Sequence, residues 1–146
     1  MSSIRKVELE DLLGREAVSL DDNGVHDLLG GNVVLVTGAG GSIGSELCRQ
    51  IARFKPSRLV LVDASEFALY SIGEELSVSH PLLQCQLWAA DVRDKDRVTE
   101  IFTQERPVVV FHAAAYKHVP LMESVNAWQA VRTNALGTHT VARIAQ

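Results

Sequence analysis

The stretch from Val33 to Gly44 constrains the fold of this chain more than any other. It opens with four apolar residues, mostly β-branched, which predict a strand over 33–36 buried on both faces. A glycine-rich turn follows, and then a helix over 43–54 whose buried face is predicted to carry Ile43, Leu47, Ile51 and Phe54. A strand, a glycine turn and a helix in this order are the context in which a glycine fingerprint indicates dinucleotide binding.

Each glycine of this turn has a predicted task. Gly38 can adopt the backbone angles of a tight turn, and Gly41 leaves the main chain open to a diphosphate. Gly44 lets the helix pack closely on the sheet, and Ser42 can add a hydroxyl donor or cap the helix. The free N–H groups of the first helical turn favour a bound anion. A flexible loop between two core elements is the alternative that the glycines alone leave open.

An acidic residue follows the second predicted strand. The second strand, predicted over 58–62, contains the apolar run 59–62 and ends at Asp63, which lies 19 positions beyond Gly44. This is close to the ~20 positions at which an acid binds the adenosine ribose of a dinucleotide. A helix-capping role for Asp63 is the alternative, and the two roles are compatible.

Further strands and helices alternate along the chain. We expect helices over 65–76, over 94–103 and from about 126 to the end, and strands over 83–89 and 108–111. In the first of these helices Phe67, Tyr70 and Leu76 are predicted to point inward, with Gly73 weakening its end. The order β-α-β-α-β-α-β-α predicts an α/β fold of the Rossmann type, a doubly wound parallel sheet whose ligands bind at the carboxyl ends of the strands.

The region before the sheet is predicted to be an arm over 1–31, followed by a partial nucleotide-binding domain over 32–146. Within the arm we expect a helical stretch over 7–13, an extended segment over 17–20 and a short helix over 25–29. The arm could also take part in a contact between subunits, so a homo-oligomer is left open.

Composition excludes several classes of function. The net charge is −4 with no basic cluster, which argues against nucleic acid as a partner. Cys48 and Cys85 have no metal-ligand spacing and are predicted to be core residues, so no metal site is expected. No apolar run approaches the ~18 residues of a membrane span, and no signal-peptide pattern is visible, so we expect a cytoplasmic protein.

Three blocks of sequence resemble the extended short-chain dehydrogenase/reductase group. They are the glycine turn 37–44 with Asp63, the motif Asp91-Val92-Arg93-Asp94, and the run from His112 to Ala115. The run 112–123, HAAAYKHVPLME, is similar to polysaccharide-biosynthesis proteins of the capsular CapD type, which are nucleotide-sugar 4,6-dehydratases and epimerases, and Thr133-Asn134 with Gly137-Thr138 matches the next block of these proteins. The opening 7–15 also resembles the segment before their catalytic domain. The chain departs from the family in having Asn126-Ala127 where Asn-Pro is common.

The resemblance implies an NAD site, with NAD favoured over NADP because the Asp63 carboxylate would repel a 2′-phosphate. It implies that Asp91 and Val92 line the adenine and that Asn134 orients main chain near the active site. The full set of implied cofactor-binding residues is Gly38, Gly41, Ser42, Ile43, Gly44, Asp63, Asp91, Val92, Ala113, Ala114, Ala115 and Asn134. Residues Lys117 and His118 would border the sugar site, and His112 is expected to be a satisfied core histidine.

The implied function is the NAD-binding portion of a nucleotide-sugar 4,6-dehydratase of the UDP-N-acetylhexosamine type, in surface polysaccharide biosynthesis. In such proteins the catalytic residues lie later in the chain, so they are expected beyond Gln146, and this portion alone is expected to be inactive. Membrane helices precede the domain in many long members and would anchor the full protein to the inner membrane. A nucleotide-sugar 4-epimerase or 4-reductase and a non-catalytic NAD-binding module are the alternatives.

Overall fold

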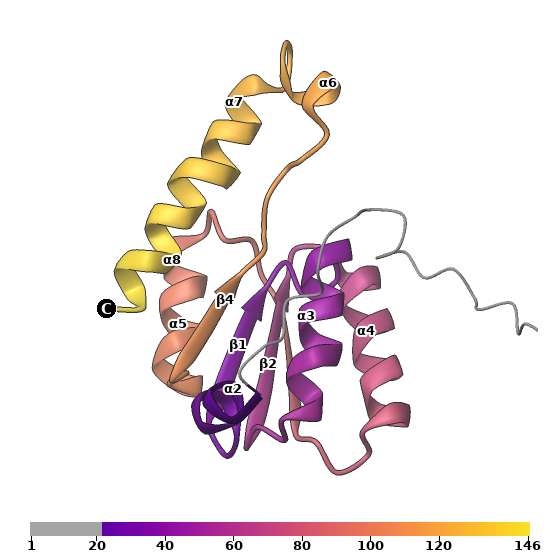
Figure 1. Cartoon of the computed structure of the whole chain (residues 1–146). Helices are drawn as coiled ribbons and strands as arrows, with labels where there is room; N and C mark the ends of the chain where they lie inside the picture. The colour runs from indigo at the N-terminus through magenta and orange to yellow at the C-terminus, as the bar shows by residue number, and fades with distance from the viewer. Residues whose placement is uncertain (1–21) are drawn as a thin grey trace, which may run out of the picture.

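A computed structural model of the chain describes residues 22–146 (Figure 1). The predicted alternation of strands and helices is confirmed. The elements in chain order are α2 (Asp22–Leu29), β1 (Val33–Thr37), α3 (Ser42–Arg53), β2 (Arg58–Asp63), α4 (Glu66–Ser79), β3 (Cys85–Ala89), α5 (Lys95–Glu105), β4 (Val109–His112), α6 (Val119–Met122), α7 (Ala127–Ala130), η1 (Val131–Gly137) and α8 (Thr138–Ile144). The parts of the arm predicted over 7–13 and 17–20 lie outside the described residues.

The four strands of the described region form one parallel sheet in the order β3-β2-β1-β4. Strand β1 is central, and its Leu35 is aligned with Val60 of β2 and Val110 of β4. Because all strands run the same way, their carboxyl ends meet at one edge, as expected for a Rossmann-type α/β fold.

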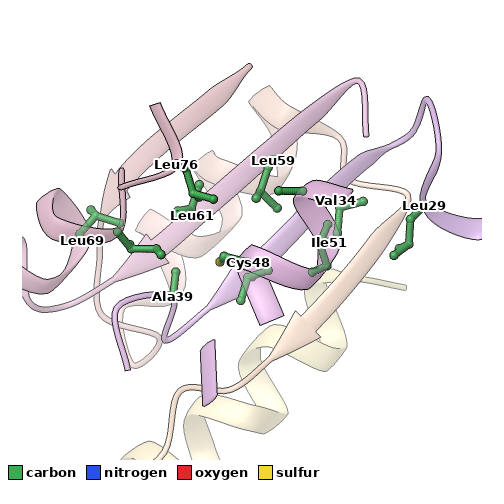
Figure 2. Packing of buried hydrophobic residues seen from close by; sticks show 12 residues of the cluster. Leu29, Val34, Ala39, Cys48, Ile51, Leu59, Leu61, Leu69 and Leu76 are labelled. Atoms are coloured by element: carbon green, nitrogen blue, oxygen red, sulfur yellow. The ribbon is translucent and has the colours of Figure 1, made fainter. Parts of the chain in front are cut away.

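The sheet separates two apolar layers, since successive side chains of a strand point to opposite faces. On one face, Val34, Val36, Leu59 and Leu61 pack with residues of α2, α3 and α4, as Figure 2 shows for nine labelled residues. On the other face, Leu35, Val60 and Val62 pack with Ile101 of α5. Each fully buried Val or Leu side chain contributes about 1.5–3 kcal/mol, so the central strands hold both helical layers in place.

Both cysteines were predicted to be core residues, and both pack in the layer formed by α2, α3 and α4. Cys48 of α3 is fully buried in the cluster and Cys85 packs against it, and neither forms a disulfide. Burial raises the pKa of the Cys48 thiol to about 12 and also raises that of Cys85. Both thiols therefore stay protonated and act as small apolar residues.

Three side chains predicted to point inward are exposed instead. On α4, Phe67 and Tyr70 face outward, and the buried side is formed by Leu69, Ile72, Gly73 and Leu76. Gly73 does not weaken the end of this helix: its missing side chain makes room for Leu87 of β3. On α3, Ile43 in the first turn is exposed, whereas the buried side of the helix is formed by Gly44, Cys48, Ile51 and Ala52.

The end of the chain differs from the single helix predicted from residue 126 onward. Segments α7, η1 and α8 form one continuous rod, but η1 has π-helical hydrogen bonding over seven residues. In Figure 1 this rod passes α5 at its lower end and rises above the carboxyl edge of the sheet at its upper end. The short helix α6 was not predicted from the sequence; Pro120 lies in its first turn, a position that suits proline.

Candidate nucleotide-binding cleft

A cleft of about 280 Å³ opens at the carboxyl edge of the sheet. It lies between the glycine turn after β1, the turns after β2 and β3, the loop after β4 and η1. The residues that line it are Gly38, Gly40, Gly41, Asp63, Ala64, Ser65, Ala68, Ala90, Asp91, Val92, Ala113, Ala114, Ala115, Tyr116 and Thr133. Most of these side chains are small, so main chain is accessible along much of the wall.

Two positions of the glycine turn, Gly38 and Gly44, leave no room for a side chain beside main chain, and Gly40 leaves none beside Ala68 of α4. Gly38 has a φ of +64°, and a Cβ there would lie 2.7 Å from the main chain of Ala114. A Cβ on Gly44 would lie 2.6 Å from the carbonyl carbon of Gly38 and closer still to its oxygen. The predicted roles of Gly38 in the turn and of Gly44 in close packing are confirmed.

Gly41 differs from these two glycines. It precedes α3 as the N-cap residue, with φ −72° and ψ 169°, and a Cβ there would approach only the Gly38 oxygen, at 3.2 Å. The packing of the protein itself therefore does not require a glycine at this position, which lines the cleft. The first-turn N–H groups of α3 have no acceptor four residues earlier in the helix and are oriented for an anion. Ser42 is the first helical residue and does not cap α3, contrary to one of its two predicted roles.

Asp63 connects the turns after β1 and β2. Its Oδ2 accepts a hydrogen bond of 2.8 Å from the N–H of Gly40, and its Oδ1 accepts one of 2.8 Å from the N–H of Ser65. The Ser65 hydroxyl in turn caps α4 by accepting from Ala68. These bonds fix the carboxylate in the wall of the cleft, and each oxygen keeps a further lone pair for a ligand.

Asp91, after β3, is paired with Arg93. The Arg93 guanidinium donates to both carboxylate oxygens, from Nε at 2.9 and 2.8 Å and from Nη2, and the Arg93 N–H adds a bond of 2.9 Å. These bonds lower the pKa of Asp91, which is therefore ionised at neutral pH. Arg93 also donates to Gln129 of α7, at 3.1 Å, and so connects the turn after β3 to the terminal rod.

His112, at the end of β4, bridges three elements. Its Nδ1 lies 2.7 Å from the Thr37 hydroxyl of β1, and its Nε2 lies 3.0 Å from the Thr138 hydroxyl of α8. Thr138 donates its own hydrogen to the Asn134 carbonyl, so it accepts from Nε2–H, and Nδ1 accepts from Thr37. Burial lowers the pKa of His112 and keeps the ring neutral. The expectation of a satisfied core histidine agrees with this geometry.

The loop after β4 is held by Asn134 of η1. The side-chain amide of Asn134 accepts from the Tyr116 N–H and donates to the Tyr116 carbonyl, both at 2.8 Å. Beyond this point Lys117 donates to the Ser42 hydroxyl at 3.3 Å, across the mouth of the cleft. His118 is exposed and precedes α6.

The structure thus brings together eight of the residues singled out in the sequence as lining of one cleft: Gly38, Gly41, Asp63, Asp91, Val92, Ala113, Ala114 and Ala115. Ser42, Ile43, Gly44, Lys117, His118 and Asn134 are not part of that lining. Arg93, Tyr116 and Thr133 belong to the matched sequence motifs, but the sequence assigned them no role. The structure shows Arg93 as the partner of Asp91, Tyr116 as the partner of Asn134, and Thr133 as a wall residue of the cleft.

Residues 22–146 offer neither a metal site nor a membrane span. No group of three or more His, Cys, Asp or Glu side chains in that part of the chain is arranged to hold a metal ion. No helix there is both long enough and apolar enough to cross a bilayer.

Comparison with known proteins places this geometry in a family. The profile of the family described as "Polysaccharide biosynthesis protein" matches residues 34–146. The capsular polysaccharide biosynthesis protein CapD of Staphylococcus aureus is 46% identical over 147 residues, which cover 100% of this chain and 24% of CapD. The dTDP-glucose 4,6-dehydratase of Salmonella typhimurium is 32% identical over 114 residues, covering 77% of this chain and 30% of that enzyme.

A solved structure shares the fold. The UDP-glucose-4-epimerase of Stenotrophomonas maltophila, with bound NAD and formylated UDP-arabinopyranose, superposes with a TM-score of 0.65 at 25% identity, covering 77% of this chain and 33% of the epimerase. The chain therefore spans between a quarter and a third of the length of these proteins. With the family profile matched over most of its length, the chain belongs to the polysaccharide biosynthesis protein family.

Proposed function

We propose that this chain is the NAD-binding portion of a nucleotide-sugar 4,6-dehydratase of the UDP-N-acetylhexosamine type, acting in surface polysaccharide biosynthesis. The observation that carries the proposal is the position of the Asp63 carboxylate. It lies in the same cleft as the glycine turn and is tied to that turn through the Gly40 N–H. A diphosphate on the turn would therefore have a ribose-binding acid beside it.

The glycine turn fits the diphosphate. Gly41 borders the cleft without a side chain, and its surroundings in the protein would tolerate a Cβ with a small shift. Filling this position would therefore obstruct mainly a ligand. The N–H groups of Ser42, Ile43 and Gly44 in the first turn of α3 would donate to the phosphate oxygens, favoured by the helix dipole.

Asp63 would accept hydrogen bonds from the adenosine ribose hydroxyls through its remaining lone pairs. A 2′-phosphate at that place would bring its negative charge against the carboxylate. No lysine or arginine is among the residues that line the cleft and could offset this repulsion. The site therefore favours NAD over NADP.

The rest of the cofactor would follow the edge of the sheet. On the side of β3, Asp91 and Val92 would border the adenine, and Asp91 can accept from its amino group because Arg93 does not use all its lone pairs. On the side of β4, the small side chains of Ala113–Ala115 would let the nicotinamide half lie close to main chain. Asn134 would act indirectly, by fixing the Tyr116 main chain at the end of that wall.

The sugar chemistry is supported by the relatives, one of which is named as a 4,6-dehydratase. When bound, NAD would take a hydride from C4 of the sugar and return it to C6 after water has been eliminated. This chain would bind and orient the cofactor, and Lys117 and His118 would border the sugar. The catalytic acid and base are expected beyond Gln146.

A 4-epimerase is the second candidate, because the structural neighbour described above is a UDP-glucose-4-epimerase. The two reactions differ in the mass of the product. A dehydratase releases a sugar nucleotide that is lighter by one water, whereas an epimerase leaves the mass unchanged. Mass spectrometry of the product formed by the full-length protein from a UDP-N-acetylhexosamine separates the two.

The cofactor proposal is tested by calorimetric titration of the full chain with NAD and NADP. Asp63→Asn removes the charge that the ribose hydroxyls would meet, and hydrogen bonds to charged groups are worth about 1.5–3 kcal/mol. We expect NAD binding to weaken by about 10- to 100-fold and the preference over NADP to narrow. Glu74→Gln makes the same change of charge at an exposed position on α4 and should leave both affinities unchanged.

Equal affinity of the unsubstituted chain for NAD and NADP would remove the role given to Asp63. Absence of binding to either dinucleotide would refute the proposed function as a whole.

A further inference from the structure

The outer strand β3 leaves one row of main-chain groups unpaired. It ends the sheet on its side and pairs only with β2. The Gln84 carbonyl and the Ala90 N–H bond to β2 at 2.9 and 3.0 Å. Because hydrogen bonding alternates along a strand, the N–H and C=O groups of Cys85, Leu87 and Ala89 point away from β2. No other strand among residues 22–146 reaches them.

Helix α4 turns an aromatic side chain toward this free edge. The helix contacts α3 through Ala68, which packs on Gly40, and through Glu75, which binds Arg49 at 2.6 Å. At about 100° per residue, Tyr70 lies on the opposite side of the helix. That side faces away from α3 and toward β3, and Tyr70 is exposed there.

Tyr70 is one of several large apolar residues exposed along α4, the loop after it and β3. Their exposed fractions range from 37% to 97%, and they are Phe67, Tyr70, Val78, Leu82 and Leu87. At about 150–250 Å² for a whole large side chain, they offer on the order of 600 Å² to a partner. Each partner in an interface of standard size contributes about 800 Å². The apolar area therefore approaches what a stable dimer needs, and the strand edge would add to it.

The charge pattern of the edge favours a second copy of the chain as that partner. Segment 81–90, PLLQCQLWAA, contains no charged residue, although outer strands are commonly guarded by charges that prevent pairing. Two copies of this segment can therefore meet without repulsion between like charges. A lipid surface would leave the unpaired main-chain groups without partners. The other outer strand, β4, is followed by α8, and in a longer chain a right-handed crossover would add the next strand beside it.

We propose that β3 is the interface of a homodimer, in which the β3 strands of two copies pair antiparallel about a two-fold axis. The outward N–H groups of Cys85, Leu87 and Ala89 would then donate to carbonyls of the other copy, and the two sheets would become one. The two α4 helices would lie on the same face with Tyr70 toward the axis. Because the pairing is antiparallel, the two nucleotide clefts would open at opposite ends. The inference goes beyond the proposed function and does not depend on what the cleft binds.

The first test is sedimentation velocity of the full chain over a range of concentrations. We expect the unsubstituted chain to sediment as a dimer at high concentration and to dissociate on dilution. Gln86→Lys places a positive charge at an exposed position of β3, so two like charges meet near the axis. It should raise the dissociation constant of the dimer at least about 10-fold. Gln50→Lys makes the same change at an exposed position of α3 and should leave that constant unaltered.

Amide hydrogen exchange followed by NMR tests which edge is used. The N–H groups of Cys85, Leu87 and Ala89 should exchange rapidly in the dilute monomer and slowly in the dimer. The N–H groups of Gln86 and Trp88 point toward β2, so they should be protected at both concentrations. This alternation along β3 is specific to strand pairing, since an interface made only by side chains would not produce it.

A chain that remains monomeric at every concentration overturns the inference. So does a dimer in which the exchange along β3 is unchanged, or in which β4 is protected instead. Should Gln86→Lys fail to fold, Leu82→Lys changes a loop residue that is almost fully exposed, and dimerisation equal to that of the parent in this variant would overturn the inference as well. A monomer that binds NAD refutes this inference alone, whereas a dimer that binds neither NAD nor NADP refutes the proposed function alone.

Discussion

Gly41 and Gly44, at the start of α3, should respond differently to the addition of one methyl group: the first in ligand binding, the second in stability. Gly44→Ala places a Cβ 2.6 Å from the Gly38 carbonyl carbon and closer still to its oxygen. These are main-chain atoms at the end of the central strand, so they cannot turn aside as a side chain would. Gly41→Ala meets only the Gly38 oxygen at 3.2 Å, and its φ of −72° suits alanine.

The cost of the first substitution follows from the required movement. The helix and the turn must separate until the added Cβ clears both the carbonyl carbon and the oxygen of Gly38, and overpacking of this kind costs about 1–3 kcal/mol or more. We take the upper end, about 3 kcal/mol. For a domain of this size a change of 1 kcal/mol shifts the melting temperature by roughly 3–5 °C, so Gly44→Ala should lower it by about 10–15 °C. Gly41→Ala should lower it by no more than about 3 °C.

For ligand binding, Gly41→Ala is the informative variant. Gly41→Ala stays folded, but its methyl group enters the cleft and blocks the approach of a diphosphate to the main chain. We expect it to lose at least about 10-fold in NAD affinity while keeping the far-UV circular dichroism of the parent. Thermal melts and calorimetric titration of both variants measure the two effects. A melting temperature of Gly44→Ala within about 2 °C of the parent would refute the steric reasoning.

Three further outcomes follow from the contacts described. Burial lowers the pKa of His112 below its ordinary value of 6.5, so the unfolded chain binds its proton first as the pH falls. The free energy of unfolding in urea should therefore decrease from about pH 7.5 to about pH 5.5. His112→Gln should remove the part of this pH dependence that His112 contributes, and an unchanged dependence on pH in that variant would contradict the reasoning. Arg58→Ala removes the charged partner of the buried Glu105 carboxylate and leaves only the Trp88 indole N–H, each donor lying at 2.9 Å. It should lower the free energy of unfolding by about 1–3 kcal/mol. Glu105→Gln in the same background should restore part of that loss, and a failure to do so would contradict the reasoning. Asn134→Ala releases the Tyr116 N–H, whose hydrogen exchange should then accelerate at least about 10-fold, while equal exchange rates would show that the loop is held by other contacts.

The parallel sheet and the place of the cleft could be predicted because they depend on local patterns. Runs such as Leu59–Val62 are apolar without interruption, as strands buried on both faces must be, and each is followed by a turn signal and a helical stripe. Parallel strands end at one edge, so Gly38, Asp63, Asp91 and Ala113 were bound to meet there.

The faces of the helices could not be predicted with the same certainty. Helix α4 is apolar on more than one side, so the stripe through Phe67 and Tyr70 competes with the one through Leu69, Ile72 and Leu76. Which stripe is buried depends on how the helix lies across β2 and β3, and Gly73 packs so closely on Leu87 of β3 that a Cβ there would clash with its side chain. The spacing of apolar residues along α4 does not predict this contact with a residue of another element.

The amino-acid sequence by itself determined the order of elements, the parallel sheet and the chemical character of the cleft, because glycine, valine and aspartate act through short-range backbone preferences and burial. The tertiary structure alone decided which polar groups are already engaged: Asp91 with Arg93, His112 with Thr37 and Thr138, and Asn134 with Tyr116. It also decided that the Thr133 hydroxyl is left unpaired. These pairings join residues 2 to 75 positions apart. Most of them exist only once the helices are docked on the sheet, since hydrogen bonds need a geometry that no local pattern of residues specifies.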